Sequence, residues 1–255
     1  MLVILSPSKT MDSLVPVHHQ KPTFPEYLKL SEALAEILKK MSSVQLSKLM
    51  KINPELAQLT FERFQQWIMP FNEGNSTPAV FSYIGEAFRG LDAHSLTNTD
   101  LSFAQNHLRI LSGFYGILRP LDLIQPYRLE MSLRLTAPGK TKNLYEYWRP
   151  AITESLVKAL GHQKDNILIN LASQEYIKSI DNKALKARII TPVFKEYKNN
   201  KPVIVAMYAK KARGMMARRI IQNQLTKPDD LKLFDSEGYY YTPLLSTENE
   251  FVFTR

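Results

Sequence analysis

The sequence contains no cysteine, which excludes disulfide bonds, zinc-thiolate sites, iron-sulfur clusters and cysteine nucleophiles together. Only 9 of the 255 residues are glycine, too few for a flexible or repetitive chain. No apolar run approaches the length of a membrane span. The first five residues are apolar but lack the basic region and cleavage site of a signal peptide, so we expect a cytoplasmic protein without a membrane partner.

Positive charge is what the sequence has in excess. Lys and Arg number 33 against 24 Asp and Glu, a formal net charge of +9, while the 44% of hydrophobic residues is ordinary for a globular chain. Such an excess favours polyanionic partners, because each neutralised phosphate releases condensed counterions. Nucleic acid is the partner we expect, although composition alone leaves anionic membranes and phosphorylated small molecules open.

Hydrophobic periodicity, capping residues and turn residues predict the secondary structure. They predict helices at 25–41, 44–50, 55–67, 97–107, 144–160 and 209–224, the fifth interrupted at Pro150. Apolar runs predict strands at 1–5, 166–171, 189–194, 203–208 and, at the edge of a sheet, 251–253. Because the strands do not recur at regular βαβ spacing, we predict a mixed α/β fold: a single compact domain, residues 1–255, with helices around a mixed sheet.

A further strand is predicted by strict alternation at 127–135. Tyr127, Leu129 and Met131 fall on one face, and Arg128 and Glu130 on the other. A period of two indicates a half-buried strand with its charged face in solvent.

The strongest local feature is a basic stretch from Lys195 to Arg219, in which eight cations accompany the single acid Glu196. A merely soluble basic helix is the alternative, but the excess over the whole chain favours phosphate contacts. The candidate DNA contacts on the predicted helix are Lys210, Lys211, Arg213, Arg218 and Arg219.

A second basic set surrounds an apolar run that contains Gly113 and Gly116. These glycines do not form a phosphate-cradling signature, so we interpret them as structural. The set comprises Arg109, Arg119, Arg128, Arg134, Lys140 and Lys142, of which Arg119, Arg128 and Arg134 are candidate phosphate contacts.

The two predicted helices at 44–50 and 55–67 have the shape of a helix-hairpin-helix element, at about 43–68. Backbone N–H groups at the start of the second helix would hold a phosphate without reading bases. The hairpin lacks the usual glycines, so from the pattern alone a plain αα-hairpin is favoured. Its candidate DNA contacts are Lys48, Lys51, Ile52 and Asn53.

Ser8, Lys9 and Glu175 are the candidate catalytic residues, because they follow predicted strand ends, where α/β sites are built. Residues 6–9 match the S-x-x-K pattern of serine-lysine hydrolases, but the partner motifs are missing, which indicates an accidental match. A turn that presents Lys9 still predicts an anion pocket. Five scattered histidines show no metal-ligand spacing, so we expect no metal site and no cofactor: His18, His19, His94, His107 and His162.

Four blocks of sequence together resemble the YaaA family of bacterial peroxide-stress-resistance proteins, almost from end to end. The blocks are LSPSKTMD at 5–12, the run from 111 to 131, NLAS with EY at 170–176, and YAKKARG at 208–214. The resemblance implies a cytoplasmic protein, induced by hydrogen peroxide, that limits oxidative damage and unincorporated iron. It also implies DNA binding through a positively charged cleft, and a cantaloupe-like fold with a helix-hairpin-helix element. It brings no established catalytic activity.

We therefore predict an oxidative stress response protein that binds duplex or distorted DNA, branched DNA included, without strong sequence specificity. The rival hypothesis is an enzyme that acts on a nucleotide or nucleic acid at a pocket near Lys9, Glu175 and Lys210. A pocket that joins these residues would favour the rival, and side chains that face apart would remove it. The third hypothesis, direct iron chelation, predicts stoichiometric iron binding, which we do not expect.

Overall fold

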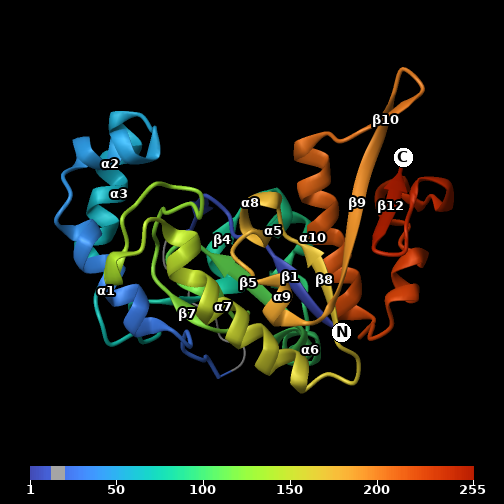
Figure 1. Ribbon diagram of the computed structural model, residues 1–255, viewed down its shortest axis with the longest axis horizontal. Helices are drawn as coiled ribbons and strands as arrows, with labels where there is room; N and C mark the ends of the chain where they lie inside the picture. Colours follow the sequence, from blue (N-terminus) through green and yellow to red (C-terminus); the bar gives the residue numbers. More distant parts are fainter. Residues whose placement is uncertain (13–20) are drawn as a thin grey trace.

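The computed structural model describes residues 1–12 and 21–255, and it centres on a mixed sheet with helices packed around it (Figure 1). The predicted fold class is confirmed. Among the described residues the sheet has eight strands in the order β11-β12-β9-β8-β1-β5-β6, with β10 paired to β9. Its strands are β1 (Leu2–Leu5), β5 (Leu108–Ser112), β6 (Gly116–Leu118), β8 (Ile167–Leu171), β9 (Arg188–Lys198), β10 (Lys201–Val203), β11 (Tyr240–Tyr241) and β12 (Glu250–Thr254).

The central strands of the sheet run parallel. β1 pairs with β5 on one side and with β8 on the other, and β9 pairs in parallel with both β8 and β12. The carboxyl ends of β1 and β8 therefore meet at one edge of the sheet, with Leu5 opposite Leu171. Short two-stranded pairs lie outside it: β2 (Thr10–Met11) with β4 (Tyr83–Ile84), and β3 (Thr77–Pro78) with β7 (Leu123–Ile124).

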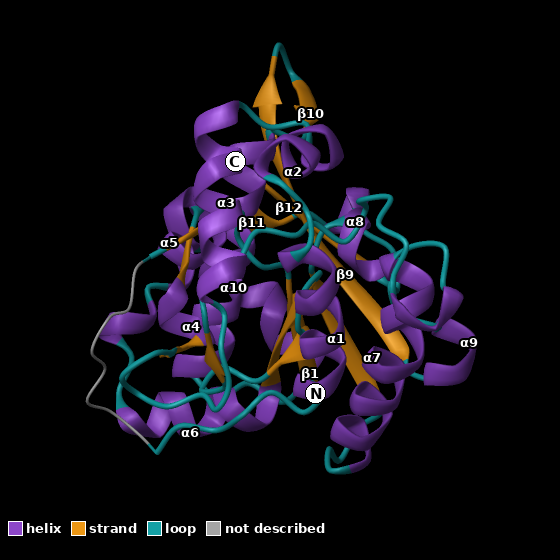
Figure 2. Cartoon of the chain, turned by 90° about the vertical axis from the view of Figure 1, so that its left-hand side faces the viewer, coloured by secondary structure: helices purple, strands orange, loops and turns teal. Residues whose placement is uncertain are grey.

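Helices cover both faces of the sheet (Figure 2). On one side lie α5 (Glu86–Leu91), α6 (Asn98–His107) and α10 (Ala206–Gln222), and on the other lie α7 (Leu144–Gly161) and α9 (Asn182–Leu185). The remaining helices are α1 (Leu28–Lys39), α2 (Ser43–Met50), α3 (Pro54–Gln66), α4 (Ala79–Ser82) and α8 (Gln174–Ile177). None of the described helices is both long and apolar enough to cross a membrane.

Local signals set the helix starts where the sequence predicts them. The Ser42 hydroxyl accepts a hydrogen bond from the Gln45 N–H, and the Gln45 side chain accepts one from Ser42 N–H, which completes a capping box. The Asn53 side chain caps α3 by accepting from Leu56 N–H, with Pro54 in the first turn, and Thr97 caps α6 in a second capping box. α7 continues through Pro150 without the predicted interruption.

The strand predicted at 127–135 is wrong. Tyr127, Leu129 and Met131 are buried as the alternation requires, but no described strand pairs with the segment. Side chains satisfy its backbone instead: Ser132 N–H donates to the Glu175 carboxylate, and Tyr127 N–H contacts the Met11 sulfur. The expected solvent face also departs from the alternation, because Glu130 is only 7% exposed. Most of the segment is therefore buried without strand pairing.

Two further strand predictions need correction. The predicted strand at 203–208 is wrong, since β10 ends at Val203 and α10 begins at Ala206; the apolar residues Ile204, Met207 and Tyr208 are exposed rather than buried. The strand at 251–253 exists as β12 but does not lie at an edge, because β11 covers its other side.

The structural interpretation of the glycine pair is confirmed. Gly116 has φ of +74°, and a Cβ there would lie 2.4 Å from the ring of Trp148. Trp148 is fully buried and donates its indole N–H to the Gly113 carbonyl at 2.9 Å.

Helices α5 and α10 touch backbone to backbone. An added Cβ on Gly214 would lie 1.8 Å from the Ala87 carbonyl oxygen, and one on Gly90 would lie 2.2 Å from that of Lys211. This contact holds α10 at a fixed position over the sheet.

We expect Gly214→Ala to lower the free energy of unfolding by about 2 to 3 kcal/mol, because the two helices must separate to admit a methyl group. Urea denaturation measures the change. Gly161→Ala is the matched control: no described atom lies within 4 Å of its added Cβ, and the helical alanine should stabilise by at most about 1 kcal/mol. Equal midpoints for the two variants would contradict the close helix contact.

Candidate functional site: a basic pocket at the carboxyl edge of the sheet

A cavity of about 600 Å³ opens where β1 and β8 end. The turn after β1, the turn after β8, helices α5 and α10 and the segment 127–130 all contribute to its wall. In open α/β sheets, ligands bind in the crevice outside the carboxyl ends of the strands. The pocket brings together three of the predicted site residues that lie far apart in sequence: Lys9, Glu175 and Lys210.

Ser8 holds the turn in place. Its hydroxyl donates to the Ile84 carbonyl at 2.5 Å and accepts from Thr10 N–H at 3.2 Å, so its proton is already engaged. The contact joins the ends of β2 and β4 at Gly85, where an added Cβ would meet the Ser8 hydroxyl. In this arrangement Ser8 shapes the pocket and is not poised as a nucleophile.

Lys9 extends into the pocket beside a carboxylate that sequence reasoning missed as a site residue. Its ammonium lies 3.0 Å from Glu130 Oε1, and Arg128 Nη2 donates to the same oxygen at 3.0 Å. Glu130 is only 7% exposed, and its Oε2, like Arg128 Nε, is buried without a partner among the described atoms. Two cations thus share one carboxylate, which leaves the trio with net positive charge.

Glu175 has a positioning contact. Its Oε1 accepts from both the N–H and the hydroxyl of Ser132, at 3.1 and 3.0 Å, and so ties α8 to the segment that carries Arg128 and Glu130. Ser173 occupies the N-cap position of α8 but makes no side-chain cap bond; its N–H donates to the Ser6 hydroxyl instead.

Lys210 and Arg213 line the opposite wall from one face of α10, three residues apart. Neither side chain has a hydrogen-bond or ion-pair partner in the described parts of the chain. Lys210 is exposed, whereas Arg213 is half-buried, and burial lowers the pKa of its guanidinium. The pocket therefore contains a cation that the protein itself leaves unpaired.

The other three predicted contacts on α10 are paired with acids. Lys211 contacts Glu237 at 2.5 Å, Arg218 contacts Asp92 at 3.4 Å, and Arg219 contacts Asp235 at 3.1 Å. These three cations line a separate groove of about 350 Å³.

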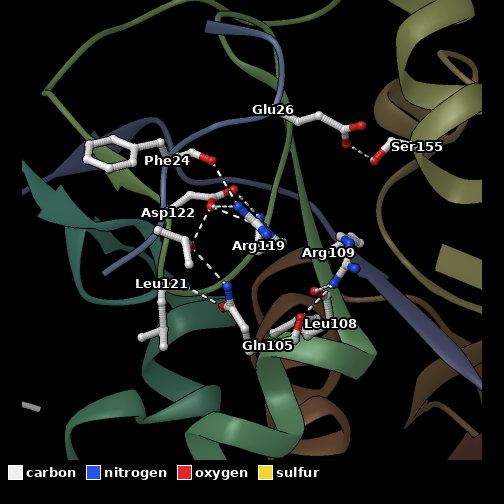
Figure 3. A network of polar contacts seen from close by, with 10 residues as sticks. Phe24, Glu26, Gln105, Leu108, Arg109, Arg119, Leu121, Asp122 and Ser155 are labelled. Carbon is white, nitrogen blue, oxygen red and sulfur yellow. Dashed lines mark hydrogen bonds and ion pairs between the residues drawn. The ribbon is translucent and has the colours of Figure 1, made fainter. Parts of the chain in front are cut away.

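Arg119 is held in a network of polar contacts (Figure 3), and its side chain is 39% exposed. It donates to the Asp122 carboxylate through its backbone N–H, Nε and Nη2, and also to the Phe24 carbonyl. Arg109 is likewise directed at the carbonyls of Gln105 and Leu108, and burial lowers its pKa to about 10. Arg134 is exposed and unpaired among the described residues.

The α2–α3 pair forms a tight helical hairpin, with Lys51 in the left-handed region at φ of 53°. Asn53 uses its side chain to cap α3, and Ile52 bonds Ser47 through both its N–H and its carbonyl. Lys48 and Lys51 have no partner within 1–12 and 21–255. The hairpin lies at one end of the molecule and the β9–β10 hairpin at the other, with α5 and α8 between them (Figure 1). A DNA-binding role for this helix pair stays a prediction.

No group of three or more His, Asp or Glu residues in the described parts of the chain is arranged to hold a metal ion. His107 contacts the Met1 carbonyl and stacks on Phe103, and His94 packs against Phe81. His18 and His19 lie outside the described residues.

The fold and pocket define a mixed α/β protein with a cavity at the carboxyl edge of its parallel strands, lined by four cations and three carboxylates. Comparison with known families is more specific. The family model H2O2_YaaD, described as peroxide stress protein YaaA, matches residues 1–245, so the chain belongs to this family. Membership supports a role in the response to peroxide stress.

Proposed function

We propose that the protein serves the peroxide stress response in the cytoplasm by binding DNA, duplex or distorted, without reading its sequence. Contacts to the phosphate backbone supply the affinity, and bound DNA is thereby protected from oxidative damage. The proposal includes a part in limiting unincorporated iron, which the family resemblance implies. We expect this effect without stoichiometric iron binding by the purified protein.

The observation that supports the proposal is the unpaired state of Lys210 and Arg213. Five other predicted contacts already have carboxylate partners: Arg119, Arg128, Lys211, Arg218 and Arg219. The predicted cations that remain available for phosphates are therefore these two, with Lys48, Lys51 and Arg134. Contacts of this kind position a protein on DNA but carry no sequence information. Weak discrimination among sequences follows.

Charge reversal of Lys210 and Arg213 together is expected to weaken DNA binding evenly across unrelated sequences. It should also reduce the slope of log K against log salt concentration by about two, one for each lost phosphate contact. Fluorescence anisotropy with labelled duplexes measures both quantities. Lys158→Glu is the control, because Lys158 lies on α7, across the sheet from α10, and is already paired with Glu154 and Glu26. A double variant that binds every duplex as tightly as Lys158→Glu would refute the α10 contacts.

The pocket also favours a second candidate function, an enzyme that acts on a nucleotide or nucleic acid. One cavity contains Lys9, Glu175 and Lys210, and the Lys9–Glu130 pair adds a buried carboxylate to it. An unbiased screen for nucleotide turnover tests this candidate. Turnover that persists in Lys9→Gln would argue against catalysis at this pocket.

A further inference from the structure

We infer that the pocket binds a nucleoside that carries a terminal phosphate, with Arg213 and Lys210 holding the phosphate. The inference rests on the pocket of the second candidate function and not on duplex binding. It names a ligand class and the two residues that recognise its anionic end.

Arg213 gives the first reason. A guanidinium carries five N–H donors in a fixed fork suited to phosphate and carboxylate oxygens. Half-burying this group without any partner costs free energy, since its lost hydration is not replaced. Arg213 nonetheless stands unpaired in the pocket wall, on a helix that the Gly90 and Gly214 contacts fix in place. A rigid, unpaired and half-buried cation is suited to an anion.

The charge balance around Arg213 gives the second reason. Glu130 is shared by Lys9 and Arg128, and Glu86 pairs with Arg89 at 2.7 Å, so two of the three pocket carboxylates are already engaged with cations. Lys210 adds a second unpaired cation one turn from Arg213. The anionic end of a ligand would therefore meet two cations with no competing carboxylate between them on α10.

The remaining wall of the pocket indicates which groups, besides the phosphate, the ligand carries. It combines apolar and aromatic side chains with polar ones, among them Ser6, Thr10 and Gln174, and a cavity of about 600 Å³ greatly exceeds a phosphate ion but suits a small organic molecule. A flat base and a sugar would fill the apolar part, while the phosphate reaches α10. The larger apolar and aromatic lining residues are Leu5, Phe88, Tyr127, Leu129, Leu171 and Tyr176.

Isothermal titration of the full-length protein with a nucleoside monophosphate, the matching nucleoside and inorganic phosphate tests the inference. We expect binding of the monophosphate at one site per chain and at least tenfold weaker binding of the nucleoside and of phosphate alone, because each lacks half of the recognised chemistry. Equal affinity for the three compounds, or no binding of the monophosphate, would overturn it.

Adjacent lysines on α10 provide a matched pair of variants. Lys210→Gln should weaken binding of the monophosphate about tenfold or more, whereas Lys211→Gln should leave it unchanged, because Lys211 faces Glu237 in the other groove. Lys210 is exposed, so its variant keeps the test decisive even if the half-buried Arg213→Gln does not fold. Equal effects of the two lysine variants would overturn the assignment.

Two sources share this chemistry: a free nucleotide and the 5′-phosphorylated end of a DNA strand. Short oligonucleotides with a 5′-phosphate or a 5′-hydroxyl distinguish the two sources. Tighter binding of the phosphorylated oligonucleotide assigns the pocket to strand ends. Equal binding of the two oligonucleotides assigns it to free nucleotides. Internal duplex binding is measured separately on the same protein. Nucleotide binding without duplex binding would sink the DNA proposal alone, and the reverse would sink only this inference.

Discussion

Raising the salt concentration from about 50 to about 200 mM is expected to lower the affinity for duplex DNA by roughly two to three decades, if each of the five unpaired candidate cations neutralises one phosphate. Each contact between a lysine or arginine and a phosphate releases a condensed counterion, and added salt opposes that release. The residues through which this dependence would arise are the unpaired cations Lys48, Lys51, Arg134, Lys210 and Arg213. The slope of log K against log salt reports how many contacts form.

Anisotropy titrations at four or five salt concentrations measure this slope on two duplexes of unrelated sequence. Plots of log K against log salt concentration should coincide for the two duplexes, because phosphate contacts do not distinguish bases. A titration that is flat in salt would rule out binding dominated by phosphates. A steep slope on one sequence and none on the other would contradict sequence-independent binding.

Local signals in the sequence predict the helices well. Ser42, Asn53 and Thr97 each satisfy the first free N–H groups of a helix with their own side chains, so the start of the helix is determined within four residues of chain. The arrangement of strands into a mixed sheet follows from their irregular spacing. Pairing is not local, however, and the segment at 127–135 shows the consequence. Its alternation correctly predicts the burial of Tyr127, Leu129 and Met131, but it wrongly predicts strand pairing and the exposure of Glu130.

The difference between local and long-range contacts also explains the basic stretch at 195–219, much of which lies on α10. Counted along the sequence, eight cations accompany one acid, but the acids that pair with Lys211, Arg218 and Arg219 come from residues 92, 235 and 237. Charge counted in a window of sequence overstates free charge on a surface, because ion pairs form between distant segments. Only contacts in the folded chain show that Lys210 and Arg213 remain unpaired.

The candidate pocket could be predicted in part. Lys9 and Glu175 follow strands that run parallel and adjacent, so their meeting at one edge follows from the general placement of sites in α/β proteins. Glu130 could not be recognised in the same way. The alternation at 127–135 places Glu130 on the solvent face of a half-buried strand, whereas in the fold Glu130 is 7% exposed and lies in the pocket wall.

Asp122→Ala is expected to lower the free energy of unfolding by about 3 kcal/mol, because the change leaves several donors without an acceptor. Asp122 is 1% exposed and accepts from Arg119 through three groups and from the Thr23 hydroxyl at 2.6 Å. Burial raises the pKa of this carboxyl against the opposing influence of Arg119, so its charge is tolerated only because these donors surround it. Urea denaturation measures the loss.

Two further variants separate the network from a general effect of removing a carboxylate. Asp122→Asn keeps the shape of the side chain and one acceptor oxygen but not the charge. Its free energy of unfolding should therefore fall by less than that of the alanine variant. Glu86→Gln removes an exposed ion pair with Arg89 and should change stability by at most about 1 kcal/mol. Asp122 and Arg119 join residues 23–24 to the turn at 119–122 (Figure 3). The loss of stability in Asp122→Ala should therefore be accompanied by faster amide hydrogen exchange in both segments than in the unchanged protein. Equal stabilities of Asp122→Ala and Glu86→Gln would show that the network contributes no more than a surface pair.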